Sequence, residues 1–239
     1  MVKIFAYIGS PLKNNSNTAA LTRLLFDKLT AREADIDCEL FTGGGVKILP
    51  CKGCWTCMTR GFCPLDEHDD MGLLKQQMLE ANFIIWGSPL YTEHVSGQTK
   101  TFLDRLAAWY HTIRLAGKPG MTIATSAGGN PDTVHDYLNM LLSVAGVKVL
   151  TRIDAIGYFP GMLMEDDALH SRLDAAVDKI QPYLSGKRRI ESDQQMDQWF
   201  QTMKMKVIMG KDYLPADYDY WESRGLLHLD SYAGLLARI

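Results

Sequence analysis

Two hydrophobic patterns alternate along the first 184 residues of this 239-residue chain. Short, nearly continuous apolar runs are typical of strands buried on both faces, whereas apolar residues that recur every three or four positions indicate helices. The runs predict strands at residues 2–8, 36–41, 83–86, 121–125 and 147–156. The longer spacing predicts helices at residues 16–29, 71–81, 97–110, 130–145 and 166–184. Strands and helices therefore alternate through five repeats.

Regular alternation of strands and helices is typical of an α/β fold, in which helices cover both faces of a parallel sheet. For five strands we expect the flavodoxin-like, doubly wound sheet with the strand order 2-1-3-4-5. Such sheets bind ligands outside the carboxyl ends of their strands, where the strand order reverses. The loops at the ends of strands one, three and four are residues 9–17, 87–98 and 125–130. We expect a ligand site there.

Residues 187–239 depart from this alternation and hold seven of the 23 aromatic residues. A segment of this length is too short for an independent core. We therefore expect a flavodoxin-like domain at residues 1–186 and an aromatic-rich C-terminal extension at residues 187–239, packed on the domain or on a neighbouring subunit. Because large apolar side chains are rarely left in water, we also expect a homo-oligomer, either a dimer or a tetramer.

Charge and hydropathy exclude two classes of partner. The 25 basic and 28 acidic residues give a net charge of −3, without the positive surplus of a nucleic-acid-binding protein. No apolar stretch approaches the ~18 residues of a membrane-spanning helix, and the apolar run at residues 4–8 is too short for a secretion signal. We expect a cytoplasmic protein with no nucleic-acid partner and no membrane partner.

The loop that joins the first strand to the first helix is polar and carries one cation. Free N–H groups and the dipole at a helix N-terminus bind anions, and the hydroxyl and amide groups of residues 9–18 would add donors to such a site. The alternative is that Ser16 only caps the helix and that the rest is an ordinary polar turn. Neither the G-x-G-x-x-G pattern nor the P-loop lysine motif follows the strand.

Four motifs in these loops resemble the FMN-binding segments of NADPH-dependent FMN reductases, a group within the flavodoxin-like superfamily. They are G-S-P-x-K-x-x-S-N-T from residue 9, S-P-L-Y from residue 88, V-S-G-Q-x-K-x-F-L-D-R from residue 95 and S-A-G-G from residue 126. The resemblance implies that FMN is the cofactor and that twelve residues contact it. Those at the phosphate are Ser10, Lys13, Ser16, Asn17 and Thr18, and those at the isoalloxazine ring are Pro89, Leu90, Tyr91, Ser126, Ala127, Gly128 and Gly129.

Four of the five cysteines are crowded into a long loop at residues 43–70. Their spacing is C-x2-C-x2-C-x5-C, formed by Cys51, Cys54, Cys57 and Cys63. In a reducing compartment such crowding favours a metal site over disulfides, and closely spaced thiolates are typical of iron–sulfur clusters. Structural zinc and free thiols are the alternatives. Within the FMN reductase group the loop resembles that of iron–sulfur flavoproteins, which implies that these four cysteines bind a [4Fe–4S] cluster.

Three functions are compatible with this sequence. The first is a redox flavoprotein in which electrons from a one-electron donor such as ferredoxin pass through the cluster to FMN and then to a small-molecule acceptor. The second is a cluster-free reductase that uses NAD(P)H to reduce FMN and then a quinone, a nitroaromatic compound or free flavin. The third is a binding module with a structural zinc loop and no catalysis. Because the chemistry would belong to the cofactor, we expect no side-chain general base.

Overall fold

A parallel β-sheet forms the centre of the computed structural model, which describes residues 1–33 and 35–239. The long strands are β1 (Val2–Ile8), β2 (Ile36–Thr42), β3 (Phe83–Tyr91), β5 (Pro119–Ser126) and β6 (Lys148–Ile156). They lie in the order β2-β1-β3-β5-β6, and the two-residue β4 (His94–Val95) pairs antiparallel with the end of β3. Counted without this short strand, the order is 2-1-3-4-5. The predicted α/β fold with a flavodoxin-like sheet is therefore confirmed.

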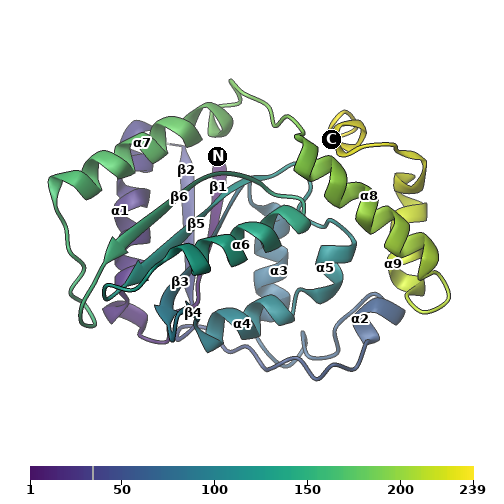
Figure 1. Cartoon of the computed structure of the whole chain (residues 1–239), viewed down its shortest axis with the longest axis horizontal. Coiled ribbons are helices and arrows are strands. Elements are labelled where there is room, and N and C mark those ends of the chain that lie inside the picture. Colours follow the sequence, from purple (N-terminus) through teal and green to yellow (C-terminus); the bar gives the residue numbers. More distant parts are fainter. Residues whose placement is uncertain (34) are drawn as a thin grey trace.

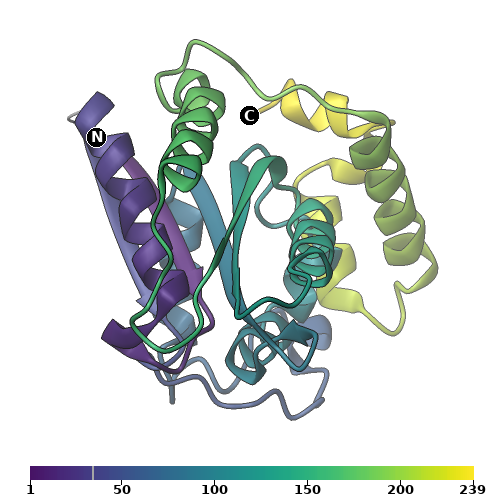
Figure 2. The same ribbon diagram turned by 60° about the vertical axis from the view of Figure 1, so that its left-hand side comes forward.

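Helices cover both faces of the sheet, because alternate strand positions present apolar side chains to each face. One face is covered by α1 (Asn17–Arg32) and α7 (Asp167–Leu184). The other is covered by α3 (Met71–Glu80), α4 (Gly97–Asp104) and α6 (Asp132–Val144). Figure 1 shows the sheet between these layers, and Figure 2 shows α1 and α7 on one side of it, opposite α6. None of the helices in the described residues is long and apolar enough to cross a membrane.

Two boundaries lie farther along the chain than the hydrophobic pattern predicts. The third strand continues past residue 86 because Ser88 and Pro89 remain in register with β5. The helix expected from residue 130 begins at Asp132, whose N–H donates to the side-chain oxygen of Asn130 over 3.0 Å. Asn130 therefore precedes the helix by one residue more than expected, and it still accepts one of the N–H groups that the first turn leaves free.

The segment at residues 97–110 forms two helices, α4 and α5 (Ala107–His111), instead of the single helix that we predicted. The break falls at Arg105, whose side chain is buried and forms ion pairs with Asp66 and Asp69 of the cysteine-rich loop. These partners lie 36 to 39 residues away in the chain. Local periodicity cannot reveal a contact of this range, so the sequence pattern appeared continuous.

The C-terminal extension packs on the domain of its own chain. It contains α8 (Gln194–Met209), α9 (Pro215–Ser223), the 3₁₀ turn η2 (Leu226–His228) and α10 (Tyr232–Leu236). Figure 2 shows these helices outside α6. Phe200 and Trp221 are fully buried in a core shared with Val144 of α6, and the Trp221 indole N–H donates to the His111 carbonyl oxygen over 2.8 Å. The burial of these two aromatic rings therefore requires no partner subunit.

Candidate functional site

A cavity of about 170 Å³ lies at the carboxyl ends of β1, β3, β5 and β6. Eight of the twelve predicted FMN contacts line it, namely Ser10, Asn17, Thr18, Pro89, Leu90, Tyr91, Ser126 and Ala127. The remaining lining residues are Leu12, Thr125, Gly157, Tyr158, Phe159 and Pro160. The fold thus brings the three predicted loops together at the point where the strand order reverses.

The first turn of α1 borders this cavity and supplies N–H groups for an anion. Ser16 is the N-cap, and its side-chain oxygen accepts the N–H of Ala19 over 3.1 Å. The N–H groups of Asn17 and Thr18 belong to the same turn and have no acceptor within the helix. Because the helix dipole also favours negative charge at this end, a phosphate group fits here. Ser16 is buried and caps the helix, while its neighbours Asn17 and Thr18 line the cavity.

Buried hydroxyl groups connect the strand ends beneath this turn. The hydroxyl oxygens of Thr18 and Thr125 are 2.6 Å apart, which joins α1 to β5. The side-chain oxygen of Ser10 accepts the N–H of Leu12 over 3.3 Å, so the hydroxyl proton of Ser10 can still be donated to a ligand. The contact between Thr18 and Thr125 therefore ties the start of α1 to the end of β5, where the third predicted loop begins.

The loop after β6 forms a fourth wall, which the sequence analysis did not include. The side-chain amide of Asn17 donates a hydrogen bond from Nδ2 to the Phe159 carbonyl oxygen over 2.9 Å. A Cβ atom at position 157 would lie 2.2 Å from Nδ2 of Asn17, so only glycine allows the Asn17 side chain to lie this close to the backbone after β6. The Asn17 side-chain oxygen is buried and accepts no hydrogen bond from the described residues. A buried acceptor without a donor fits a ligand hydroxyl, such as those on the ribityl chain of FMN.

The opposite end of the cavity presents apolar and backbone groups. Leu90 and the partly exposed Tyr91 end β3 there. The Ser126 hydroxyl donates to the Gly129 carbonyl oxygen over 2.9 Å and accepts the Gly128 N–H over 3.4 Å, which fixes a tight turn after β5. Gly128 has φ at 119°, a conformation that side chains disfavour. A flat aromatic ring suits this combination of an aromatic side chain and closely placed backbone.

Lys13 differs from the other predicted phosphate contacts. It lies on the 3₁₀ turn η1 (Lys13–Asn15), and its side chain is exposed. Solvent screens the charge of an exposed lysine, so such a residue contributes little to binding. The assignment of Lys13 to the phosphate stays a prediction.

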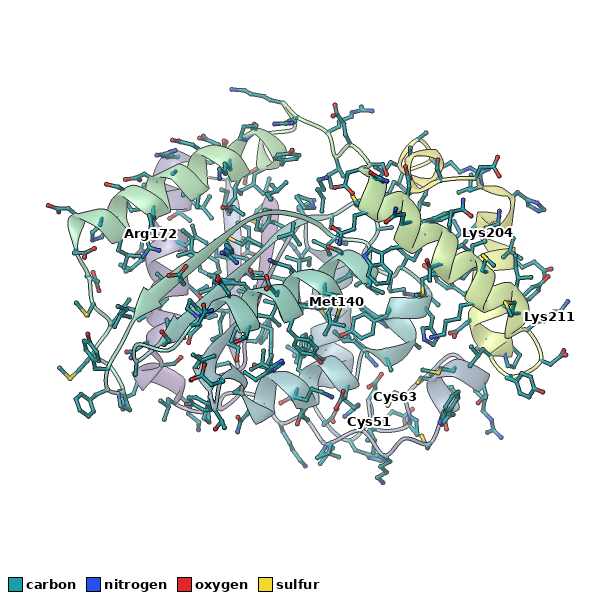
Figure 3. The ribbon with its side chains drawn as sticks, viewed as in Figure 1. Cys51, Cys63, Met140, Arg172, Lys204 and Lys211 are labelled. Atoms are coloured by element: carbon teal, nitrogen blue, oxygen red, sulfur yellow. The ribbon has the colours of Figure 1, made fainter. Side chains whose placement is uncertain are left out.

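The four clustered cysteines lie on the loop between β2 and α3, and all are free thiols. Cys51 and Cys54 are exposed, whereas Cys57 and Cys63 are half-buried and line a second cavity of about 340 Å³. Cys57 belongs to a short helix, α2 (Thr56–Thr59), and Cys63 follows that helix by four residues. Figure 3 shows Cys51 and Cys63 on this loop, at the end of the molecule that α2 and α9 occupy in Figure 1.

The loop presents the donor set of an iron–sulfur cluster without being closed around one ion. The Thr56 hydroxyl donates to Cys54 Sγ over 3.3 Å and lowers the pKa of that thiol. Burial, together with the nearby Cys63 side chain, raises the pKa of Cys57. Within residues 1–33 and 35–239, no three cysteine, histidine or carboxylate side chains converge on one ion. A [4Fe–4S] cluster binds one thiolate at each of its four irons, so these thiolates lie farther apart than the ligands of a single metal ion. Four cysteine thiols match such a cluster in ligand type and number.

The sequence of residues 2–159 matches the NADPH-dependent FMN reductase family. The match spans more than half of the chain and includes every strand of the sheet. The chain belongs to the NADPH-dependent FMN reductase family. It is therefore an FMN-dependent oxidoreductase. The cavity at the strand ends offers a helix N-terminus, a buried acceptor and an apolar end, which are features that suit FMN.

Relatives of this FMN reductase family member include two iron–sulfur flavoproteins. One, from Archaeoglobus fulgidus, is 29% identical over 95% of this chain and 100% of its own length, so the likeness extends into the C-terminal extension. The other, from Methanocaldococcus jannaschii, is 32% identical over 59% of this chain and 72% of its own length. The solved apo structure of an NADH:FMN oxidoreductase has a TM-score of 0.58 at 22% identity, covering 82% of this chain and 94% of that one. This last likeness supports the fold.

Proposed function

We propose that this FMN-dependent oxidoreductase also carries a [4Fe–4S] cluster, bound by Cys51, Cys54, Cys57 and Cys63, and that it links one-electron transfer to two-electron transfer. The observation that carries the proposal is the presence of four free thiols on one loop of an FMN reductase. Soft thiolate ligands suit iron–sulfur clusters. The two relatives named iron–sulfur flavoproteins support the same assignment, one of them over its full length.

The residues of this chain bind and orient the cofactors. When bound, FMN exchanges one or two electrons and a cluster exchanges one. We assign the phosphate to the N–H groups of Asn17 and Thr18 with the Ser10 hydroxyl, and a ribityl hydroxyl to the Asn17 side-chain oxygen. Tyr91 flanks the ring. We assign no general base, because electron transfer to a flavin is the chemistry of the cofactor.

We further propose a ferredoxin-type protein or NAD(P)H as the electron donor and a small molecule as the acceptor. The cavity has an apolar rim, since its lining residues Tyr158 and Phe159 are 56% and 67% exposed. Met162, which is 60% exposed, donates its N–H to the Phe159 carbonyl oxygen and extends this apolar surface. Exposed apolar side chains gathered in one place mark contact sites. This rim supports a homo-oligomer, a dimer or a tetramer, with a partner subunit beside the flavin. Free thiols suit a reducing compartment, and we expect the protein in the cytoplasm.

The second candidate function is a cluster-free reductase that passes hydride from NAD(P)H to FMN and then reduces a small molecule. The exposure of Cys51 and Cys54 favours it, because these two thiols do not share the cavity that Cys57 and Cys63 line. In that case the cysteine loop would have only a structural role, and its four thiols would bind no metal.

Replacing Cys57 distinguishes the two candidates. In Cys57→Ser purified without oxygen, iron and acid-labile sulfide should fall from about four per chain to a small fraction of that value. FMN content should not change, because the FMN contacts lie on other loops. Cys38→Ser is the matched control, since Cys38 is a half-buried thiol of β2 outside the loop, and it should retain both cofactors. Iron content that is equal in the two variants overturns the ligand assignment.

A further inference from the structure

A single arginine connects the two ends of the cysteine loop. Arg105 follows α4, and its side chain is 0% exposed. One guanidinium nitrogen donates to the carbonyl oxygen of Leu49, two residues before Cys51, over 2.8 Å. The other donates to the carboxylate of Asp66, three residues after Cys63, over 2.7 Å. The segment that carries all four thiols is therefore held at both ends by one side chain.

Asp69 completes this closure. Its buried carboxylate pairs with Arg105 and accepts the N–H groups of Leu49 over 2.8 Å and Met71 over 3.0 Å. Burial alone would raise the pKa of Asp69, but the hydrogen bonds from Arg105 and the two N–H groups hold it below its usual value, so the carboxylate is charged. The base of the loop is thus a charged, buried and hydrogen-bonded pair, which loses much of its stability if either partner is removed.

Arg105 also lines the 340 Å³ cavity that Cys57 and Cys63 share. Its Nε–H is buried and has no acceptor among the described residues. Buried donors without a partner are rare in proteins, and an acceptor bound in this cavity would satisfy the N–H. The sulfur atoms of a cluster are such acceptors, and hydrogen bonds to sulfur help to set the reduction potential of a cluster.

We infer that Arg105 is a positioning residue of the cluster site, which holds the ends of the cysteine loop together and offers its Nε–H to the cluster sulfurs. This inference rests on the proposed function. Closing the loop beforehand lowers the entropy cost of gathering four thiolates. A hydrogen bond to sulfur stabilises the more negative, reduced form of the cluster and so raises its potential.

Arg105→Lys tests this role, because lysine keeps the charge but cannot reach both loop ends with a planar fork. We expect less iron and sulfide per chain than in the wild type, with unchanged FMN content. In the clusters that do form, the equilibrium constant for reduction should fall about tenfold, which corresponds to a potential lower by about 59 mV for one electron. The potential is the readout that a merely structural role would not move.

Arg172→Lys is the matched control. Arg172 also bridges a carboxylate oxygen and a carbonyl oxygen, both of Asp154, at 3.2 and 2.8 Å. It lies at the opposite end of the molecule from Cys51 and Cys63 (Figure 3). This variant should match the wild type in iron content, FMN content and cluster potential.

Asp66→Asn gives a second test that puts folding at less risk, because the Asp66 side chain is partly exposed. It loosens one end of the loop and should also lower the iron content. If Arg105→Lys yields no folded protein, the iron content of Asp66→Asn decides, with a wild-type value overturning the inference. Wild-type iron content and potential in Arg105→Lys also overturn it and leave the proposed function standing. A wild-type protein without iron overturns both.

Discussion

The cavity at the strand ends, which we propose for FMN, and the cysteine loop hold their functional groups in opposite ways. At the cavity, the buried Thr125 lies within β5 and the buried Ser10 lies two residues after β1, and the parallel sheet sets the register of both strands. On the loop, Cys51 and Cys54 are exposed, and Cys57 alone of the four lies on a regular element, the short α2. Packing within the sheet therefore fixes the polar groups of the first site, whereas the cysteine loop is held at its base by Arg105 and presents two of its four thiols to solvent.

This difference has an energetic consequence. A site whose groups are packed among neighbours loses little conformational entropy when its ligand binds, whereas exposed ligand side chains are ordered mainly by the metal centre itself. Flavin binding should therefore tolerate changes in the cysteine loop. Cluster binding should depend on the contacts that support the loop from outside, which are the Arg105 ion pairs and the packing of α9 against α2.

The largest expected effect concerns this outer support. Trp221→Ala removes a fully buried indole from α9, and the free energy of unfolding should fall by about 3–5 kcal/mol. Urea unfolding followed by circular dichroism measures this loss, and flavin affinity should change little in the protein that remains folded. Tyr213→Ala is the control, because that ring is 78% exposed, and its effect should be within about 0.5 kcal/mol. Equal stability of the two variants would show that the extension does not stabilise the domain.

The second-largest effect is a loss of stability in acid. It arises in the sheet region, where His135 of α6 is buried against β5. The Thr122 hydroxyl donates its single proton to the Asn139 side-chain oxygen over 3.0 Å. The contact between His135 Nδ1 and the same hydroxyl, at 2.8 Å, therefore has the imidazole N–H as donor. Burial lowers the pKa of His135 to about 4, so the folded protein keeps this ring neutral.

Acid should therefore destabilise the protein through His135. Below an unfolded pKa of 6.5 the unfolded chain binds a proton that the folded protein rejects until about pH 4. The stability that His135 provides above pH 6.5 is lost as the pH falls through this window, by about 3 kcal/mol in total. Unfolding free energies of the wild type and His135→Gln at pH 7 and pH 4.5 measure it. An identical pH dependence in the two proteins would contradict this assignment.

The smallest effects concern single contacts to the flavin phosphate. Ser10→Ala and Thr18→Ala should each weaken FMN binding by about 1–2 kcal/mol, because each removes a hydroxyl from a buried network next to a charged ligand. Lys13→Ala should change it by less than about 0.5 kcal/mol, because the ammonium group is exposed. Titration of flavin fluorescence gives all three affinities. A loss in Lys13→Ala that exceeds the other two would move the phosphate toward η1.

The sheet region could largely be predicted from the sequence, because its signals are local. Apolar runs located the five long strands, and glycine and hydroxyl residues at their ends indicated three walls of the cavity. The fourth wall, at residues 157–160, was missed because Gly-Tyr-Phe-Pro carries few polar groups and is placed by the distant contact between Asn17 and Phe159. The glycine directly after the fifth strand was the signal available.

For the cysteine loop and the C-terminal extension, the residue content suggested a role, but the contacts that these segments make could not be predicted from the sequence. The spacing of the cysteines indicated a possible ligand set, but the ion pairs of Arg105 join segments that no local pattern relates. The aromatic content of residues 187–239 indicated burial without saying against what, and Phe200 and Trp221 are buried within their own chain. Long-range packing decides both features, and periodicity carries no information about it.

Analysis of iron, acid-labile sulfide and flavin in the wild-type protein, purified without oxygen, tests the central claim most directly. The claim is that one chain combines a preorganised FMN cavity with a loop that a cluster completes. We predict FMN together with about four iron and four sulfide per chain. Bound FMN without iron, even after anaerobic reconstitution with iron and sulfide, would contradict the claim and leave the cluster-free reductase in its place.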